Sequence, residues 1–293
     1  MVTFTQILIN GILLGSMYGI AAIGLSLIFG TMRIIFLAQG TMIVFFAYVV
    51  YWAFTLAGID PYLCLFIVVP LAFVVGLGLF YLLFRKAAAL EDKNVSLLLA
   101  VGLMYLVENL ILKIWSATPR GLNISYSSAT IVVGGLRVSW LRLALLGLAL
   151  VSALVVNLFL KKTRVGTAVR AASEDMEATP LQGINSAWVC AVSFAIGIGL
   201  AGVAGAGMAT VYSFDYQFGF TFALKALVAL ALGGIGNVWG ALAGGLILGI
   251  LENLAAFYIG IGWIEIVSYG IFILVLIFLP QGLFGRRGLV KKV

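Results

Sequence analysis

Eight long apolar runs, each close to one membrane thickness in length, dominate this chain of 293 residues. A helix needs about 20 residues to cross a hydrocarbon core of roughly 30 Å. The runs are continuous, which favours helices over a transmembrane β-barrel, whose strands alternate in hydrophobicity. The chain is therefore predicted to be an all-α integral membrane protein with about eight to ten spans, short or broken ones included, in one transmembrane domain over 1–293. The runs are 7–30, 34–57, 61–84, 95–115, 139–160, 187–210, 241–258 and 263–280, and a shorter, glycine-broken region covers 222–240.

The composition agrees with a membrane protein. Hydrophobic residues make up 64% of the sequence and charged residues 9%, whereas a soluble domain is about half apolar and a quarter charged. Residues 1–6 carry no basic side chain, and no small-residue cleavage site closes the first run. We therefore expect this run to be a membrane span and not a signal peptide.

The basic residues predict the topology. No segment is long enough to form a soluble basic domain, so the net charge of +7 does not indicate nucleic acid binding. Twelve basic residues fall in connections an even number of spans apart, and the positive-inside rule then places the N-terminus outside and the C-terminus in the cytoplasm of a bacterial-type inner membrane. This parity requires 222–234 to cross or nearly cross. The twelve are Arg33, Arg85, Lys86, Lys93, Lys161, Lys162, Arg164, Arg170, Arg286, Arg287, Lys291 and Lys292, and the five on the other side are Lys113, Arg120, Arg137, Arg142 and Lys225.

The chain lacks the residues that common enzyme and metal sites need. It contains no histidine, which excludes imidazole metal sites and Ser-His-Asp triads. Its two cysteines, Cys64 and Cys190, lie inside apolar runs, where we expect them to pack as small residues and not to form a disulfide. We therefore predict neither a catalytic site nor a metal site.

Two interruptions in the apolar runs are candidates for the translocation pathway. The segment 232–240 contains four glycines and Asn237, and it breaks a helix at or near membrane depth. Non-helical backbone at that depth must be buried in protein or line a wet cavity, so it either lines a pathway or forms a cytoplasmic turn. At the second interruption, Gln39 and Gly40 begin a span, and Gln39 either lines a pathway or caps a helix.

Three ionisable residues lie within or near the ends of apolar runs: Glu108, Lys225 and Glu252. A charge that faces lipid is costly, so each is expected to face the protein interior, a partner chain or water. Glycines at 11, 15 and 19, at 199, 202 and 205, and at 240, 244, 245 and 249 predict close helix packing, because small residues let backbones approach in lipid.

The connection 161–186 is the richest polar segment, and it is predicted to be cytoplasmic. Residues 167–177 are helix formers, and Thr179 followed by Pro180 is typical of an N-cap with proline at the first helical position. Two short helices at a basic inner face suit docking to another protein. The alternative is a solvated connection.

Several motifs give the chain a resemblance to a known family. Glu177-Ala-Thr179 followed by Gly183 resembles the EAA-xxx-G signature with which importer permeases engage ATPase subunits, although Thr179 replaces an alanine. Over nearly its whole length the chain resembles permeases of branched-chain amino acid ABC importers of the Liv type, the H-like more than the M-like member. The motifs are Asn10–Gly19, Arg164–Ala171, Leu181–Asn185, Leu232–Gly236, Gly244–Gly249 and Leu279–Arg286.

The resemblance implies the ABC importer permease fold and a set of partners. These are two cytoplasmic ATPase subunits, an extracytoplasmic substrate-binding protein and a second permease, with an M-like heterodimer favoured over a homodimer, all in a lipid bilayer. The chain has no GxxxxGK[ST] phosphate loop, so ATP and Mg are expected on the ATPase subunits, and this chain is expected to hold no cofactor.

The predicted site residues form two sets. The ATPase-coupling set is Arg164, Gly166, Arg170, Glu174, Asp175, Glu177 and Gly183, and the translocation-pathway set is Gln39, Gly40, Gly233, Gly234, Gly236, Asn237, Glu108, Lys225 and Glu252.

The substrate and the transport class leave alternatives open. Where the family often has Asn-Phe-Ala-His-Gly, this chain has Phe36-Leu-Ala-Gln-Gly40, so urea, short amides or other amino acids are alternatives to branched-chain amino acids. A self-contained secondary carrier or channel is the main alternative of another class, and a membrane enzyme or assembly factor is a third. A secondary carrier usually has ionisable coupling residues in mid-membrane, whereas here the richest polar motif faces the cytoplasm.

Overall fold

The fold was analysed in a computed structural model that describes residues 2–88, 93–124, 126–127, 129–133, 136–176, 178–279 and 281–285. Within these residues, eight helices are long and apolar enough to cross a membrane, which confirms the predicted all-α membrane protein. The α-helices are α1 (Val2–Met32), α2 (Ala38–Ala57), α3 (Pro61–Leu79), α4 (Arg85–Ala88), α5 (Lys93–Trp115), α6 (Trp140–Lys162), α7 (Arg164–Glu174), α8 (Ser186–Val211), α9 (Phe218–Gly233), α10 (Val238–Tyr258) and α11 (Ile264–Phe278). The remaining elements are the π-helix η1 (Phe80–Phe84), the 3-10 turns η2 (Pro180–Gln182) and η3 (Ile261–Trp263), and the strands β1 (Thr130–Val133) and β2 (Leu136–Ser139).

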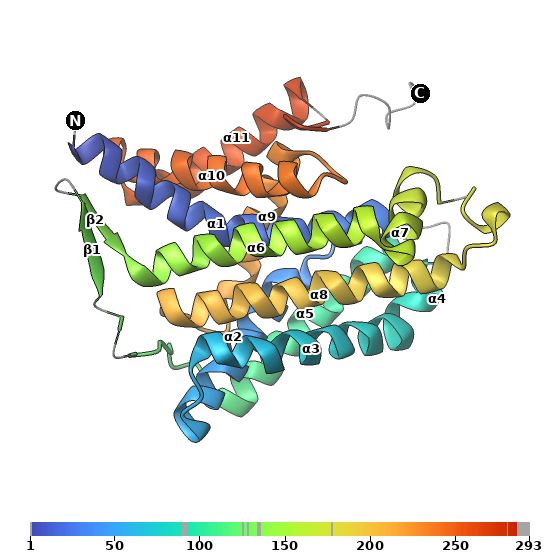
Figure 1. The fold of residues 1–293 in the computed structure, drawn as a ribbon, viewed down its shortest axis with the longest axis horizontal. Coiled ribbons are helices and arrows are strands. Elements are labelled where there is room, and N and C mark those ends of the chain that lie inside the picture. Colours follow the sequence, from blue (N-terminus) through green and yellow to red (C-terminus); the bar gives the residue numbers. More distant parts are fainter. Residues whose placement is uncertain are drawn as a thin grey trace.

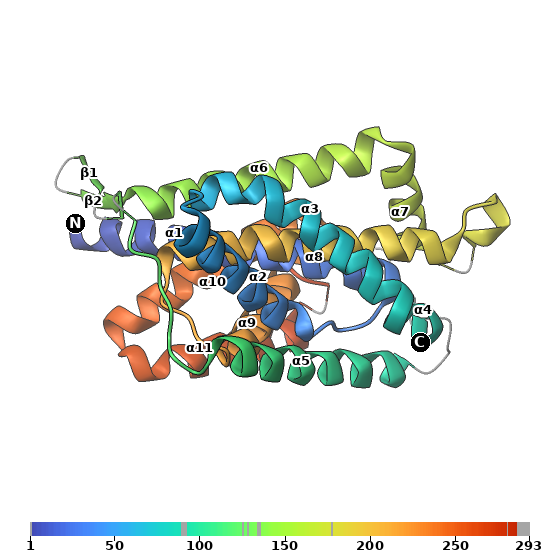
Figure 2. The ribbon, with the colours of Figure 1, turned by 90° about the horizontal axis from the view of Figure 1, so that it is seen from below.

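Two long helices form the centre of the bundle. The apolar windows of α1 and α8 are each 83% buried, whereas that of α11 is only 11% buried. The two halves of the chain interlock, since α1 packs most extensively on α10, and α8 on α3, while α2 and α9 pack on each other. Figures 1 and 2 show the other spans arranged around this centre.

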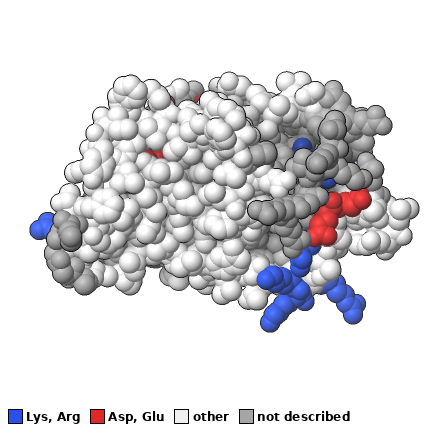
Figure 3. Space-filling view, turned by 90° about the horizontal axis from the view of Figure 1, so that it is seen from above, with Lys and Arg blue, Asp and Glu red and all other residues white. Residues whose placement is uncertain are grey.

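The bundle has two distinct ends. Figure 1 shows the start of α1 and the β1–β2 hairpin at one end, and α7 at the other. We call these the hairpin end and the α7 end. On the face seen in Figure 3, basic side chains lie near both ends of the molecule. This arrangement fits alternating spans that expose their charged connections at either end.

Glycines bring α1 and α10 into backbone contact, as their spacing predicts. A Cβ at Gly245 would collide with the backbone of Gly19, and one at Gly249 with the backbone of Gly15. At Gly11, the nearest atom to an added Cβ would be the Cα of Ile250 at 2.6 Å. Small residues are needed where helices approach this closely, because dispersion contact drives helix association in lipid.

The prediction of a span over 34–57 is wrong at its start, because α2 begins only at Ala38. Arg33 has a φ of 53°, and the segment after it is not helical. Phe36 is fully buried, and its ring packs on those of Phe84 and Phe194 at 5.7 and 4.9 Å. The segment 34–37 is therefore apolar because it packs inside the bundle, although its backbone is not helical.

The glycine-broken region 222–240 contains a short helix followed by a turn. Helix α9 has 16 residues, or about 24 Å at 1.5 Å per residue. It begins deep in the bundle, because a Cβ at Gly40 of α2 would collide with the Gly219 carbonyl. The chain then turns at 234–237 before α10 begins at Val238.

The hairpin β1–β2 was not predicted from the sequence. It is fixed to α1 by Gln6, whose Nε2 donates to the Arg137 carbonyl at 2.8 Å and whose Oε1 accepts from the Arg137 N–H at 2.9 Å. The preceding loop is held by Tyr126, which donates to Asp60 Oδ2 at 2.5 Å. Burial, together with this hydrogen bond, raises the pKa of Tyr126.

Candidate coupling and translocation sites

Helix α7 lies against the ends of α1, α6 and α8 and contains four of the predicted coupling residues. It begins at Arg164, three residues earlier than predicted, because the Thr163 hydroxyl caps it by accepting from the Gly166 N–H at 2.9 Å. Gly166 is buried, and a Cβ there would collide with the carbonyl of Phe159. The first turn of α7 is therefore locked to the end of α6.

The connection from α7 to α8 projects beyond the ends of the other helices (Figure 1). Thr179 occupies the N-cap position of a 3-10 turn that begins at Pro180, as predicted, but its hydroxyl does not cap that turn and donates to the Asp175 carbonyl at 2.6 Å. The Asp175 side chain instead accepts from the Ala178 N–H at 3.0 Å. Only one 3-10 turn follows, and it ends at Gly183 with a φ of 75°. Glu177, a predicted coupling residue, lies outside the described residues.

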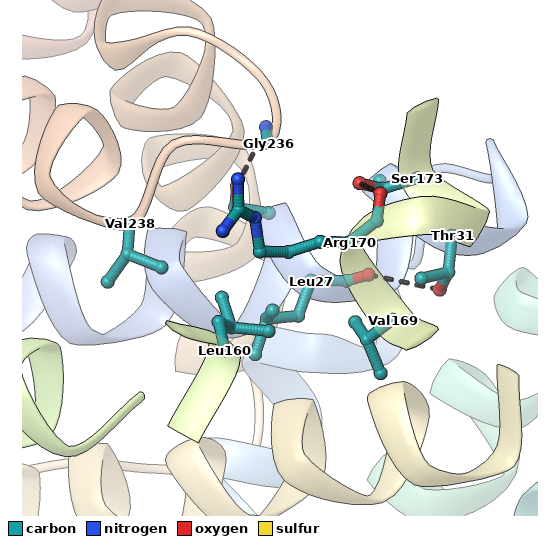
Figure 4. A pocket seen from close by; sticks show the side chains of 10 residues that line it. Leu27, Thr31, Leu160, Val169, Arg170, Ser173, Gly236 and Val238 are labelled. Carbon is teal, nitrogen blue, oxygen red and sulfur yellow. Dashed lines mark hydrogen bonds between the residues drawn. The ribbon is translucent and has the colours of Figure 1, made fainter. Parts of the chain in front are cut away.

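Arg170 and Gly236, predicted separately for coupling and for the pathway, line the same small cavity. The cavity holds about 20 Å³ and lies at the α7 end of the bundle. In Figure 4 the Arg170 side chain extends from α7 toward the turn that carries Gly236. Its lining comes from α1, α6, α7, the turn and the first residue of α10, namely Ser26, Leu27, Gly30, Thr31, Leu160, Val169, Arg170, Ser173, Gly236 and Val238.

The turn 234–237 is held on two sides. Asn237 caps α10 by accepting from the Gly240 N–H at 3.2 Å, and its Nδ2 donates to the Phe284 carbonyl at 3.1 Å. On the opposite side, the Gly236 N–H donates to Ser26 Oγ of α1 at 3.2 Å. Gly233 and Gly234 are buried, whereas Gly236 is exposed and an added Cβ would meet no atom within 4 Å.

Gln39 and Gly40 are buried between helices. The Gln39 side chain is 0% exposed, and its Nε2 donates to the Gly197 carbonyl of α8 at 3.0 Å. Its Oε1 has no hydrogen-bond partner among the described residues. Gly24 of α1 leaves room for this amide, since a Cβ there would lie 2.6 Å from Nε2. The two residues therefore join α1, α2, α8 and α9.

Lys225 and Glu252 form a buried ion pair within the bundle. The Lys225 ammonium lies 3.0 Å from Glu252 Oε1 and 3.1 Å from Oε2. The carboxylate also accepts from the hydroxyls of Tyr18 at 2.8 Å and Ser268 at 2.7 Å. The Lys225 side chain is 13% exposed and that of Glu252 only 2%. Four helices (α1, α9, α10 and α11) thus meet at one carboxylate.

Glu108 lies apart from this network, on α5. It is half-buried and has no hydrogen bond or ion pair among the described residues. Lys113, five residues along the helix, does not pair with it. Among the described residues, no group of three or more Cys, Asp and Glu side chains could hold a metal ion.

Sequence reasoning missed Tyr18, Ser268 and Ser26. Each is a single hydroxyl in an apolar helix, and helices of this kind often carry such residues without a function. The hydroxyls become informative only when folding places them beside Glu252 or Gly236. Tyr18 and Ser268 could have been sought from Glu252 alone, because a buried carboxylate requires several hydrogen-bond donors.

Comparison with known proteins gives consistent matches over the full length. The profile of the family described as "Branched-chain amino acid transport system / permease component" matches residues 7–276. The high-affinity branched-chain amino acid transport system permease protein BraD of Pseudomonas aeruginosa is 30% identical over 98% of this chain and 98% of its own length. LivH of Escherichia coli K12 is also 30% identical, covering 98% of this chain and 97% of its own.

Two further matches extend the comparison. A probable branched-chain amino acid transport permease protein LivH from Methanocaldococcus jannaschii is 29% identical over 96% of this chain and 92% of its own. Among solved structures, PsaBC from Streptococcus pneumoniae in complex with Fab matches with a TM-score of 0.50 at 10% identity, covering 93% of this chain and 91% of that chain. The second likeness concerns the fold alone.

Proposed function

Because the chain belongs to the family of branched-chain amino acid transport permeases, we propose that it forms, with a second permease, the membrane pathway of an ATP-driven importer for branched-chain amino acids. The relatives' names support this substrate and do not favour urea or short amides. The family and the eight apolar helices place the chain in the inner membrane as a multi-pass permease component. An extracytoplasmic binding protein would deliver the substrate.

The observation that carries the proposed ATPase contact is the exposed Leu181 on the α7–α8 connection. Its side chain is 88% exposed, although it lies in a polar segment outside the membrane spans. Asp175, Pro180 and Gly183 fix the turn that presents it. A preorganised apolar side chain outside the membrane suits insertion into an apolar pocket of a partner protein. We assign that partner as the ATPase subunit.

Substitution of Leu181 tests this contact. Leu181→Asp should weaken ATPase binding by about 2 kcal/mol, or roughly thirtyfold in Kd. Gln182→Asp is the matched control, because it adds the same charge at the next exposed position. Binding is measured between the detergent-solubilised permease complex and purified ATPase. Equal affinity for both variants would contradict the assignment.

The proposed ATPase contact also fixes the orientation of the chain. The α7 end then lies in the cytoplasm and the N-terminus outside, in agreement with the positive-inside rule. A cysteine introduced as Asp175→Cys should react with a membrane-impermeant thiol reagent only in permeabilised cells, since Cys64 and Cys190 are both buried. Reaction in intact cells would reverse the orientation.

For the translocation pathway, we assign Glu108 to the wetted face and the buried predicted residues to its support. Glu108 and Lys225 are the predicted charges with exposed surface, whereas Gln39, Gly40, Gly233 and Gly234 are buried. Glu108→Cys should therefore react with a water-soluble thiol reagent in the assembled transporter. Leu106→Cys, on the same helix and 63% exposed, should face lipid and stay unreactive. Equal reactivity at both positions would contradict the assignment.

A further inference from the structure

The cavity in Figure 4 lies between α7, the helix that precedes the proposed ATPase contact, and the turn between α9 and α10. Five parts of the chain meet there: α1, the end of α6, α7, the turn 234–237 and the first residue of α10. Within the described residues, α7 packs mainly on α1, α6 and α8, and not on α9 or α10. A mechanical link from α7 to α9 and α10 can therefore pass through this cavity, through α1, or through α6, which packs on both α7 and α10.

The two halves of α7 are held differently. The first turn is locked by the Thr163 cap and by the contact of Gly166 with the backbone of α6. The last turn rests on α1, where a Cβ at Gly30 would lie 3.7 Å from that of Ser173. Beneath it, the cavity has room for about one water molecule. The first turn of α7 is therefore held by direct backbone contact with α6, whereas its second half packs through side chains, with Ala172 buried, and borders the cavity.

The turn on the other side of the cavity controls two helices. It ends α9 and begins α10, and these helices are in backbone contact where Gly233 meets Gly240 and Gly244. A displacement of the turn must therefore move α9 and α10 together. Its attachment to α1 is the hydrogen bond of 3.2 Å between Gly236 N–H and Ser26 Oγ.

Arg170 is the side chain that crosses the cavity (Figure 4). It is half-buried, and within the described residues its guanidinium has no ion-pair partner. A guanidinium has five N–H donors and no acceptor, so it seeks carbonyl groups or water. Arg170 and Gly236 line the same cavity, and the Arg170 side chain extends across it toward the exposed turn.

We propose that Arg170 is a positioning residue that links α7 to the turn 234–237, so that displacement of α7 by the ATPase moves α9 and α10. This inference rests on the proposed function, because it needs an ATPase that acts on α7. Arg170 then transmits the motion and does not itself contact the ATPase.

The test is the ratio of substrate uptake to ATP hydrolysis in proteoliposomes that contain the complete transporter. Arg170→Met removes the guanidinium and keeps an unbranched apolar stem. We expect the variant to bind the ATPase normally and to hydrolyse ATP, but uptake per ATP should fall about fivefold or more, as for a coupling free energy above 1 kcal/mol. Lys162→Met, an exposed basic residue at the same end, is the matched control and should keep the normal ratio.

Three outcomes would overturn the inference. An unchanged ratio in Arg170→Met would mean that the link does not carry the motion, and loss of ATPase binding would mean that Arg170 is a docking contact. If the methionine variant misfolds, Arg170→Lys is tested in its place, because lysine keeps the charge but lacks the planar guanidinium. A normal ratio of uptake to ATP hydrolysis in Arg170→Lys would also overturn the inference. Failure of the unaltered transporter to bind ATPase would instead reject the proposed function.

Discussion

Neutralising both members of the Lys225–Glu252 pair should destabilise the protein no more than neutralising either one alone. Glu252→Gln keeps a polar side chain for Tyr18 and Ser268 but leaves the Lys225 ammonium, 13% exposed, without its counter-ion. We expect a loss of about 3 kcal/mol in unfolding free energy, because removal of one partner of a buried pair leaves an uncompensated charge. Lys225→Met should cost about 2 kcal/mol, since two hydroxyls still donate to the carboxylate.

The double variant isolates the interaction between the two charges. It removes both charges at once, so its loss should also be about 2 kcal/mol, which gives a coupling energy of about 3 kcal/mol. The assay is equilibrium unfolding in mixed detergent micelles, followed by tryptophan fluorescence. Glu108→Gln is the control, because Glu108 has no partner among the described residues, and it should change stability by less than about 1 kcal/mol. Additivity of the two single losses within about 0.5 kcal/mol would refute the reasoning.

Three further substitutions test other parts of the fold. Gly245→Val should prevent folding, because the valine side chain would collide with the α1 backbone. Gly147→Ala is the control, since the added Cβ meets no atom within 4 Å, and it should leave expression and melting temperature unchanged. Equal expression of both variants would contradict the close packing. Gly236→Leu should assemble with the ATPases but lose uptake. Residue 236 has a φ of 77°, and a leucine there adds about 1–2 kcal/mol of backbone strain at the turn. Full uptake would show that this turn is only a connector. Gln6→Ala should speed proteolysis of the hairpin loop by removing both hydrogen bonds to Arg137, and an unchanged cleavage rate would mean that other contacts hold it.

The spans could be predicted from the sequence because the bilayer sets their length and hydrophobicity together. The eight helices coincide with the eight predicted runs, and the glycines at 11, 15 and 19 predicted the tight packing of α1. The error at 34–37 has a physical reason. Hydropathy scores how apolar the side chains are and not whether the backbone is helical, so the buried, non-helical segment around Phe36 was predicted as part of a span.

The arrangement of the candidate sites could be predicted only in part. The isolated charges of Lys225 and Glu252 showed that partners must exist, and the structure pairs them with each other. Their spacing of 27 residues gives no periodic signal, since the partners lie on different helices. Likewise, nothing local relates Arg170 to Gly236, which become neighbours because α7 folds back over the end of α1. The role of each predicted pathway residue stays a prediction.

Uptake of radiolabelled leucine into proteoliposomes tests the central proposal most directly. The vesicles contain this chain, its partner permease and both ATPase subunits, with the binding protein supplied on the opposite side from ATP. The proposal predicts leucine accumulation that requires ATP and this chain, and that is lost when the ATPase subunits are omitted. Accumulation driven by an ion gradient through this chain without ATPase would contradict it and indicate a secondary carrier.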